Sequence, residues 1–361
     1  MRKKPESGRE STFMQEEFAM PCQCYIIPAD VLEKLAKDDT LSTAERQNFT
    51  DAAALDRQWR IARTAQSKIT SLASPLSVAA NLAAAPTIPV YDCKGTQSLP
   101  GTPVPNPGNS ADATVKRTFD ETDGMAKFLS KEFGRNSLDN QGMTLLSSVH
   151  FGQNFNNAFW NGTQMTYGDG DGNIFLDFTL SNDVIAHELT HGITQYTTHL
   201  AYSNQAGGLN ESCSDIFGSM FRQWRKGQTV NQADWLIGKE IMGPAAQARG
   251  FTCLRDMADP AAGHCLAPQP KHFKKYKNGM DPHESSGIPN FAFYKAAMAI
   301  GGKSWEKAGK IWYSAMANYA PSANMQMKTF AKRTRQQAKL LYASDPNIAK
   351  AIDAAWKAVG L

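Results

Sequence analysis

The segment DVIAHELTHGIT, residues 183–194, decides how the rest of the chain is interpreted. Its spacing of apolar residues predicts a helix, and His187 and His191 lie four positions apart within it. Residues at i and i+4 of a helix share one face, so both imidazoles project in the same direction. Glu188 lies between them. These histidines could supply two of the three protein ligands that a catalytic zinc ion takes.

A second segment, GGLNESCSDIFGS at residues 207–219, supplies further polar groups. Glu211 is a candidate third zinc ligand, and Asp215 and Asn210 are candidates to hold the two histidines through their other ring nitrogens. Glu188 can accept a proton from a water molecule that the metal activates. A His-Glu-x-x-His pattern alone also occurs on helices with ordinary surface histidines. Buried Asn and Asp without such partners would be costly, so the second segment disfavours that alternative.

The N-terminal part of the chain has its own organisation. The segment CYIIPADVLEKLAKD predicts a short strand, a turn at Pro28 and a helix with Asp30 as its N-cap. A longer helical run follows over about 43–69. An Ala-, Pro-, Ser- and Gly-rich stretch over 70–110 predicts a linker that leads into short strands.

In the remainder, strand-like runs come first and long helical runs follow. Strands are predicted near 144–151, 163–170 and 173–178, and helices near 111–134, 182–199, 208–226, 231–242, 287–300, 304–318, 323–341 and 346–358. This order predicts the α+β class, with a β-rich lobe before an α-helical lobe and a catalytic cleft between them. We expect three parts: residues 1–80 as tail, N-terminal segment and linker, residues 81–205 as the lobe that includes the zinc helix, and residues 206–361 as the helical lobe.

Composition and charge exclude several classes of protein. The net charge of +4 and a short lysine run at 271–277 give no basis for nucleic-acid binding. No apolar run reaches the roughly 18–20 residues of a membrane span, so we expect no membrane partner, and we expect a monomer. No apolar stretch follows the basic start, so no signal peptide is expected and the location is predicted to be cytoplasmic, with export by another route left open. Among the six cysteines, Cys253 and Cys265 could pair in an oxidising compartment.

Four separated segments resemble the thermolysin-like zinc metallopeptidases. HELTH followed by NESCSD is one, and the others are FNNAFWNGTQMTYGDGDG at 155–172, LRDMADP at 254–260 and NGMDPHESSGIPNFAFY at 278–294. The resemblance covers about residues 90–359 in the same order. It implies a two-lobed fold with one catalytic zinc ion in the cleft, and protein and peptide substrates.

The resemblance also implies a role for each matching residue. The zinc ligands would be His187, His191 and Glu211, with Glu188 as general base. Tyr202 and His283 would stabilise the oxyanion. Arg255 would bind a substrate carbonyl on the leaving-group side, and Asn157 and Ala158 would pair with an extended peptide. The pocket for the residue after the scissile bond would have apolar walls, formed by Phe175, Val184 and Leu254.

Two features depart from thermolysin itself. In thermolysin, the carboxylate that supports the histidine matching His283 lies five residues before it, and Asn278 stands at that position here. Asp281 is present two residues before His283, as in the pseudolysin and vibriolysin branch. We therefore expect Asp281 to orient His283. The family's double calcium site retains Asp183 and Asp234, but its other positions are Arg222, Leu236 and Lys239. Calcium takes several oxygen ligands, so ion pairs are expected there instead.

The N-terminal segment resembles the short propeptide of the protealysin subfamily. CYIIPADVL has Ala29 where the second proline is common, and ADWLIG at 233–238 strengthens the match. The resemblance implies a latent neutral endopeptidase that cleaves on the N-terminal side of bulky hydrophobic residues once its propeptide, an intramolecular inhibitor, is removed. Cys22 or Cys24 could block the zinc ion as a thiolate, or the leader could act by bulk alone. The alternatives are a zinc-stabilised binding protein without turnover and an exopeptidase.

Overall fold

The computed structural model describes residues 24–66 and 85–361. The N-terminal segment contributes β1 (Cys24–Tyr25), α1 (Ala29–Ala36) and α2 (Thr43–Gln66). We call residues 24–66 the leader. Helix α1 begins directly after Pro28, so the prediction of Asp30 as its N-cap is wrong. Asp30 lies in the first turn instead, where its negative charge interacts favourably with the positive end of the helix dipole.

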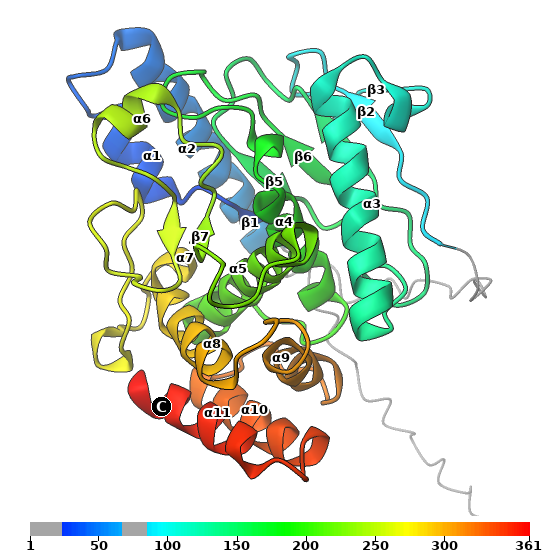
Figure 1. Ribbon diagram of the computed structural model, residues 1–361. Coiled ribbons are helices and arrows are strands. Elements are labelled where there is room, and N and C mark those ends of the chain that lie inside the picture. The colour runs from blue at the N-terminus through cyan, green and yellow to red at the C-terminus, as the bar shows by residue number, and fades with distance from the viewer. Residues whose placement is uncertain (1–23, 67–84) are drawn as a thin grey trace, which may run out of the picture.

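A six-stranded sheet forms one layer of the first lobe (Figure 1). Its order is β1-β5-β6-β4-β2-β3. The strands other than β1 are β2 (Val90–Asp92), β3 (Thr102–Pro103), β4 (Ser147–Val149), β5 (Ala158–Trp160) and β6 (Met165–Tyr167). Strand β1 pairs antiparallel with β5, with Tyr25 opposite Phe159. The leader therefore adds an edge strand to the sheet formed by residues 90–167.

One long helix packs against the sheet, and two more lie in the middle of the molecule. Helix α3 (Ala113–Phe133) is capped by Asp112, which accepts hydrogen bonds from two backbone N–H groups. Helices α4 (Asn182–Gln195) and α5 (Asn204–Lys226) cross the middle of the molecule side by side. Gly218 permits their close approach, because a Cβ atom there would lie 2.6 Å from the carbonyl oxygen of Asp183. This approach brings the polar faces of α4 and α5 together.

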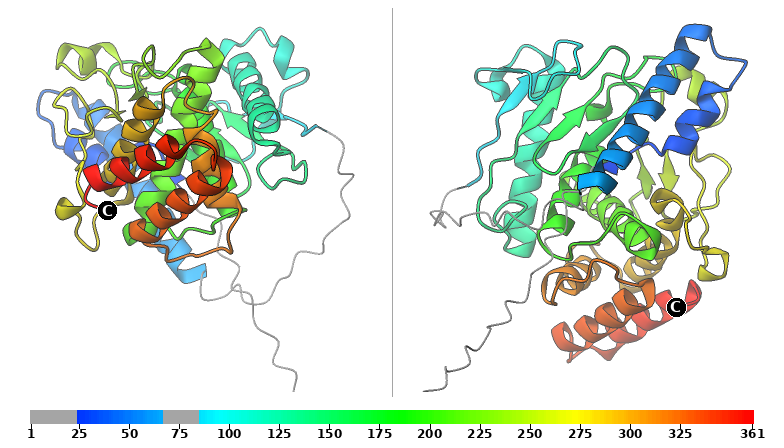
Figure 2. Two further views of the ribbon diagram at one scale, coloured as in Figure 1. Left: turned by 60° about the horizontal axis from the view of Figure 1, so that its bottom comes forward. Right: turned by 180° about the vertical axis from the view of Figure 1, so that it is seen from behind.

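The second lobe is helical, and its last helices form the end of the molecule opposite the sheet (Figure 2). Two 3-10 turns, η1 (Pro107–Asn109) and η2 (Phe178–Leu180), belong to the first lobe. After α5, the elements of the second lobe are β7 (Leu236–Ile237), α6 (Pro244–Ala248), β8 (Arg255–Asp256), η3 (Phe273–Lys275), α7 (Pro282–Ser285), α8 (Gly287–Ile300), α9 (Ala308–Ala317), α10 (Met327–Leu341) and α11 (Pro346–Ala358). The predicted α+β class, with a β-rich lobe followed by an α-helical lobe, is confirmed. None of the described helices is long and apolar enough to cross a membrane.

The helix predicted over 231–242 is wrong. This segment contains the short strand β7 and turns. Trp235 and Gly238 have φ angles of 59° and 67°, in the left-handed region that a right-handed helix cannot contain. The indole of Trp235 is buried and donates a hydrogen bond to the carbonyl of Val230. Its burial in a turn explains why a helical apolar pattern was present without a helix.

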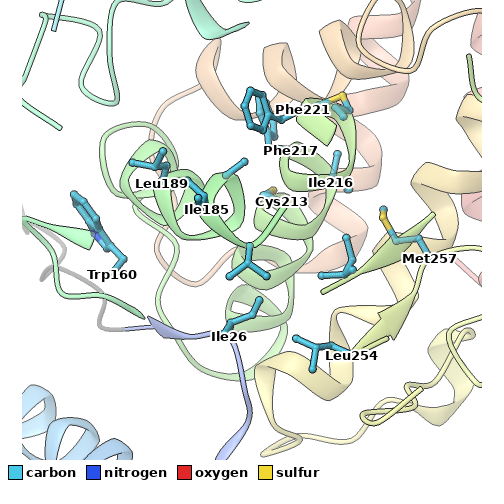
Figure 3. Packing of buried hydrophobic residues seen from close by; sticks show 14 of the residues in the cluster. Ile26, Trp160, Ile185, Leu189, Cys213, Ile216, Phe217, Phe221, Leu254 and Met257 are labelled. Atoms are coloured by element: carbon cyan, nitrogen blue, oxygen red, sulfur yellow. The ribbon is translucent and has the colours of Figure 1, made fainter. Parts of the chain in front are cut away.

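The hydrophobic core joins the leader to both lobes. Ile185 and Leu189 of α4 lie in one cluster with Ile216 and Phe217 of α5, and all four are fully buried (Figure 3). Ile26 of the leader belongs to the same cluster and is also fully buried. The leader thus packs into the same core as the two central helices.

Candidate active site

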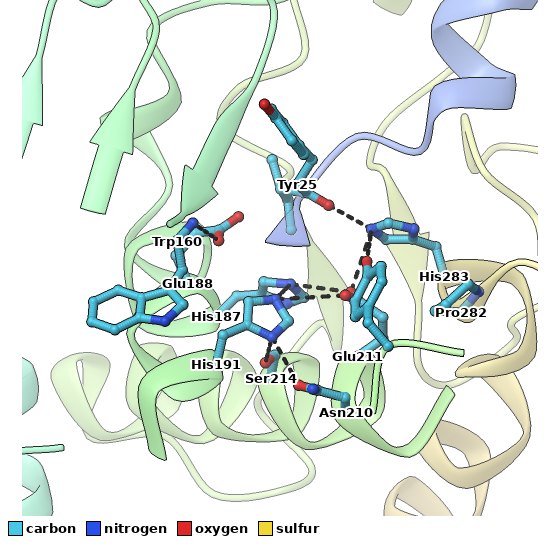
Figure 4. A network of polar contacts seen from close by, with 12 residues as sticks. Tyr25, Trp160, His187, Glu188, His191, Asn210, Glu211, Ser214, Pro282 and His283 are labelled. Atoms are coloured by element: carbon cyan, nitrogen blue, oxygen red, sulfur yellow. Dashed lines mark hydrogen bonds and ion pairs between the residues drawn. The ribbon is translucent and has the colours of Figure 1, made fainter. Parts of the chain in front are cut away.

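The three predicted metal ligands meet at one point between α4 and α5 (Figure 4). The Nε2 atoms of His187 and His191 are 3.1 Å apart. One Glu211 carboxylate oxygen lies 3.3 Å from Nε2 of His187, and the other lies 3.5 Å from Nε2 of His191. Ligand atoms at about 2.0–2.1 Å from a tetrahedral zinc ion are separated by about 3.3–3.4 Å. The donor set and its spacing therefore fit zinc.

Burial supports this assignment. All three side chains are fully buried. Within the part of the chain that the structure describes, neither carboxylate oxygen of Glu211 accepts a hydrogen bond. A buried carboxylate without donors is costly, and a cation at this point would offset that cost. Burial lowers the pKa of His191 to about 3, whereas at His187 the Asp215 and Glu211 carboxylates outweigh burial and raise the pKa.

Polar groups behind the ligands fix the imidazole rings. His187 donates from Nδ1 to Asp215 at 2.8 Å, and His191 donates from Nδ1 to Asn210 at 2.9 Å. Such outer contacts set the tautomer that leaves Nε2 free for a metal. The structure thus places Asp215 and Asn210 against the Nδ1 atoms of the two histidines, as predicted. The Ser214 hydroxyl lies 3.1 Å from the same Nδ1 of His191, a contact that the sequence reasoning missed.

The candidate general base lies on the sheet side of the ligands. Glu188 is fully buried, and one of its oxygens accepts a hydrogen bond of 2.9 Å from the backbone N–H of Trp160 in β5. Among the described residues, its second oxygen has no hydrogen-bond partner. Burial, aided by the Glu211 carboxylate, raises the pKa of Glu188 well above its usual value. A carboxylate of raised pKa is suited to taking up and returning a proton.

On the other side of the ligands lie the predicted oxyanion groups. Nε2 of His283 is 3.2 Å from the Tyr202 hydroxyl and 3.5 Å from Glu211. Asp281, the N-cap of α7, accepts hydrogen bonds from both Nδ1 and the backbone N–H of His283, at 2.8 and 2.9 Å. Burial alone would lower the pKa of His283, but the Glu211 and Asp281 carboxylates raise it above its usual value. Asp281 therefore has the orienting contact that the sequence predicted.

The leader strand runs through the site in extended form. Nε2 of His283 donates to the Tyr25 carbonyl at 2.5 Å, and Nη1 of Arg255 donates to the next carbonyl, that of Ile26, at 3.1 Å. The Ile26 N–H donates to the carbonyl of Ala158 at 3.1 Å.

The side-chain amide of Asn157 completes these contacts. It accepts from the Ile27 N–H at 3.0 Å and donates to the Ile27 carbonyl at 3.2 Å. Three groups predicted to bind substrate and one predicted to stabilise the oxyanion, His283, thus bind three consecutive leader residues. They are His283, Arg255, Asn157 and the backbone of Ala158.

The three residues predicted to form the apolar pocket, Phe175, Val184 and Leu254, are all buried. Leu254 and Ile26 of the leader belong to the same buried core cluster (Figure 3). Val184 is in α4, in the same core cluster. Phe175 packs against Phe178 and against Phe49 of the leader, with ring centroids 5.6 and 6.2 Å apart. A pocket formed by all three residues stays a prediction.

A guanidinium occupies the centre of the carboxylate cluster near α5. Arg222 lies 3.1 Å from Asp183, 3.2 Å from Asp234 and 2.6 Å from Glu240. Lys239 pairs with Asp234 at 3.3 Å. These contacts have the ion-pair arrangement expected there. Glu240 was missed, because its contact depends on the turn at Gly238 rather than on a sequence pattern.

Of the two N-terminal cysteines predicted to reach the zinc site, Cys22 lies outside the described residues. The Cys24 sulfur belongs to the same group of potential metal-binding atoms as His191 and Glu211, all within 4.8 Å of one another. Cys24 is disulfide-bonded here, so this is not its thiol form. Zinc blockage by a reduced Cys24 stays a prediction.

The fold and this site define a zinc metalloendopeptidase. Residues 82–195 match the family described as thermolysin metallopeptidase, catalytic domain, and residues 198–361 match its alpha-helical domain. An extracellular metalloprotease of Pectobacterium carotovorum subsp. carotovorum is 43% identical over 283 residues, which cover 75% of this chain and 80% of that protein. Protease PrtS of Photorhabdus sp. (strain Az29) is 39% identical over 284 residues, which cover 75% and 76%.

A solved structure extends the likeness to the leader. The precursor of protealysin, a metalloproteinase from Serratia proteamaculans, superposes with a TM-score of 0.78 at 35% identity. The match covers 93% of this chain and 99% of that chain. The chain therefore belongs to the thermolysin metallopeptidase family and is similar to its protealysin branch. The resemblance predicted from the four segments is confirmed.

Proposed function

We propose that this chain is a latent neutral endopeptidase whose leader occupies the substrate site until it is cut off. One observation carries the proposal: His283 and Arg255 bind the carbonyls of Tyr25 and Ile26, the contacts expected for the two sides of a scissile peptide bond. By this register, Ile26 takes the place of the residue after the cleaved bond. Its complete burial supports a preference for bulky apolar residues at that position.

The side chains account for the steps of peptide hydrolysis. When bound, zinc polarises the substrate carbonyl and acidifies a water molecule. Glu188 accepts a proton from the attacking water and passes it to the leaving nitrogen, which becomes an amine. Tyr202 and His283 donate hydrogen bonds to the carbonyl oxygen as it becomes negative. Arg255 holds the following carbonyl and so fixes the register of the peptide.

The proposed latency also rests on contacts of the leader helices. Asp38 pairs with Arg249 at 2.8 Å, and Asn173 donates a hydrogen bond to Glu45. Phe49 contacts Phe175. A tethered segment has an effective concentration on the order of millimolar, so modest intrinsic affinity keeps the site filled. The proposed cut lies between Thr70 and Pro89, most of which falls outside the described residues.

The alternatives differ in what they require. A binding protein without turnover would have no use for Glu188 beside the metal ligands and for His283 opposite them. An exopeptidase needs a group that binds a free chain terminus. The leader passes through the site as an internal segment, which supports an endopeptidase.

Glu188→Gln separates folding from turnover. The full-length variant should bind one zinc ion at His187, His191 and Glu211 but lose at least about 10²-fold in turnover, because its general base is gone. It cannot process itself, so added active enzyme should cut it between residues 70 and 89, as read by mass spectrometry. Wild-type turnover by the zinc-loaded variant would disprove the mechanism, and cuts confined to other regions would disprove the maturation site.

A further inference from the structure

Two cysteines and a histidine meet in the segment that carries Arg255. Cys253 and Cys265 face each other in an isolated parallel β-bridge. Its backbone hydrogen bonds run from Thr252 N–H to the His264 carbonyl at 3.0 Å and from Leu266 N–H to the Cys253 carbonyl at 2.9 Å. The backbone therefore holds both cysteines and His264 in a fixed relation.

The donor atoms of these three side chains have metal-ligand spacing. The two sulfur atoms are 3.8 Å apart, and Sγ of Cys253 is 3.7 Å from Nδ1 of His264. All three donor atoms lie within 4.8 Å of one another, and both cysteines are free thiols. Two sulfur atoms bound to one tetrahedral zinc ion at about 2.3 Å are separated by about 3.8 Å. The sulfur separation therefore equals one edge of a zinc tetrahedron.

The surroundings of His264 also suit a ligand. Its Nδ1 faces the sulfurs, and its Nε2 lies 3.4 Å from the Asp256 carboxylate. A carboxylate on the far nitrogen is the usual support of a metal-binding histidine. The Thr252 hydroxyl, 3.0 Å from Nδ1, shares that nitrogen here and would turn away when a metal binds.

We propose that Cys253, Cys265 and His264 bind a second zinc ion, distinct from the catalytic one. Binding releases the two thiol protons, and the two thiolates balance the charge of the ion. The sulfurs are buried, whereas the His264 side chain is 41% exposed, so the fourth position faces solvent. Since Leu254 and Arg255 follow Cys253 directly, the ion fastens the loop that presents them to the cleft.

The test uses the full-length chain with Glu188→Gln, which prevents self-cleavage, and with Cys22→Ser and Cys24→Ser, which remove both N-terminal cysteines that could bind the catalytic zinc ion as thiolates. We expect two zinc ions per chain by elemental analysis. Cobalt in place of zinc should give thiolate-to-metal charge-transfer absorption in the near ultraviolet, which a site of two histidines and a glutamate cannot produce. Asp256→Asn should weaken binding at this site by about 10–100-fold.

Matched variants assign the signal. Cys253→Ser and Cys265→Ser should each abolish the absorption band and leave one zinc ion per chain. His264→Ala should do the same, and because the His264 side chain is partly exposed, its loss should not disturb folding. Cys93→Ser should retain both, because the Cys93 thiol follows strand β2 and donates to the Pro100 carbonyl, not to any group of the proposed site. His187→Ala/His191→Ala should lose the catalytic ion but keep the band, which separates this site from the proposed protease function.

Two results would overturn the proposal. One is a single zinc ion per chain with no charge-transfer band although both thiols titrate as free. The other is a Cys253–Cys265 disulfide, seen as a loss of two hydrogens in the intact mass, in protein purified with thiol reductant and zinc present. That second result would assign the pair to redox chemistry instead.

Discussion

Arg255 and Asp215 form a fully buried, bidentate ion pair, with Nε and Nη2 of the guanidinium 2.9 and 2.8 Å from the two carboxylate oxygens. Asp215 also accepts the hydrogen bond from Nδ1 of His187. One carboxylate therefore orients a zinc ligand and a substrate-binding residue together. The metal site and the substrate site are coupled through this side chain.

Asp215→Asn should consequently impair both functions. Zinc affinity should fall by about 10–100-fold, measured by chelator competition, because His187 loses its charged partner. KM should rise at the same time, since Arg255 loses the ion pair with Asp215 that orients its guanidinium toward the substrate carbonyl. Asn290→Ala is the matched control: Asn290 donates to Oδ2 of Asp215 at 2.8 Å, whereas His187 donates to Oδ1, so the loss of the Asn290 amide should leave zinc affinity within a few-fold. Unchanged zinc affinity in Asp215→Asn would show that the carboxylate has no orienting role.

His283→Ala should reduce kcat by about 10²–10³-fold with a smaller change in KM, because its hydrogen bond strengthens in the transition state. Asp281→Asn should show the same kind of defect at about tenfold, since an amide can still accept the backbone bond but carries no charge. Steady-state kinetics on an internally quenched peptide give both constants. A rise in KM at constant kcat for both variants would place His283 in substrate binding only.

Thermal stability should be nearly independent of calcium, because Arg222 fills the carboxylate cluster at Asp183, Asp234 and Glu240. Melting curves of the Glu188→Gln chain in calcium and in a calcium-selective chelator should overlap. Arg222→Gln should destabilise the protein by about 3–5 kcal/mol and make its Tm rise with calcium, since the fully buried Asp183 loses the cation that neutralises it. A large calcium-dependent shift in the parent chain would contradict this assignment.

His150 predicts a loss of stability at alkaline pH. Its hydrogen bond to Asp169 and its contact with Asp112, at 2.8 and 3.0 Å, raise its pKa from 6.5 to about 9. A raised pKa stabilises the fold fully below pH 6.5, and this contribution is lost as pH rises through about 9. Both aspartates are substantially exposed, so we expect only about 1 kcal/mol.

Urea unfolding of the Glu188→Gln chain at pH 6 and pH 9.5 measures this contribution. His150→Gln should remove most of the difference, because glutamine does not titrate. An equal decrease in both proteins would assign the pH dependence to other groups.

Local spacing was enough to predict the metal centre. His187 and His191 share a face because a helix repeats every 3.6 residues, and Glu211 and Asp215 are one turn apart on the next helix. The helix over 231–242 failed for a local reason of another kind, the positive φ of Trp235 and Gly238. An apolar pattern does not reveal such backbone angles.

Contacts through the backbone were beyond the sequence pattern. The carbonyls of Tyr25 and Ile26 meet His283 and Arg255 although more than two hundred residues separate them along the chain. Every residue has a carbonyl, so no residue type marks the ones that are bound. The meeting of Cys253, His264 and Cys265 is similar, because a β-bridge in an irregular loop sets it.

The central claim is that the leader fills the cleft of an otherwise competent enzyme, and Ile26 offers a direct way to test it. Ile26→Asp places a charge in a fully buried position and should weaken docking of the leader by at least roughly 2 kcal/mol, or roughly 30-fold. After cleavage between residues 70 and 89, the mature enzyme no longer contains residue 26. The variant and the parent should therefore give identical mature enzymes, which is an internal control.

The decisive measurement is the rate of hydrolysis of an internally quenched peptide by the intact chain, taken while mass spectrometry detects only uncut protein. We predict almost no activity for intact wild type, clear activity for intact Ile26→Asp, and equal high activity for both after processing. If intact wild type were as active as its processed form, the leader would not block the cleft and the account would be contradicted.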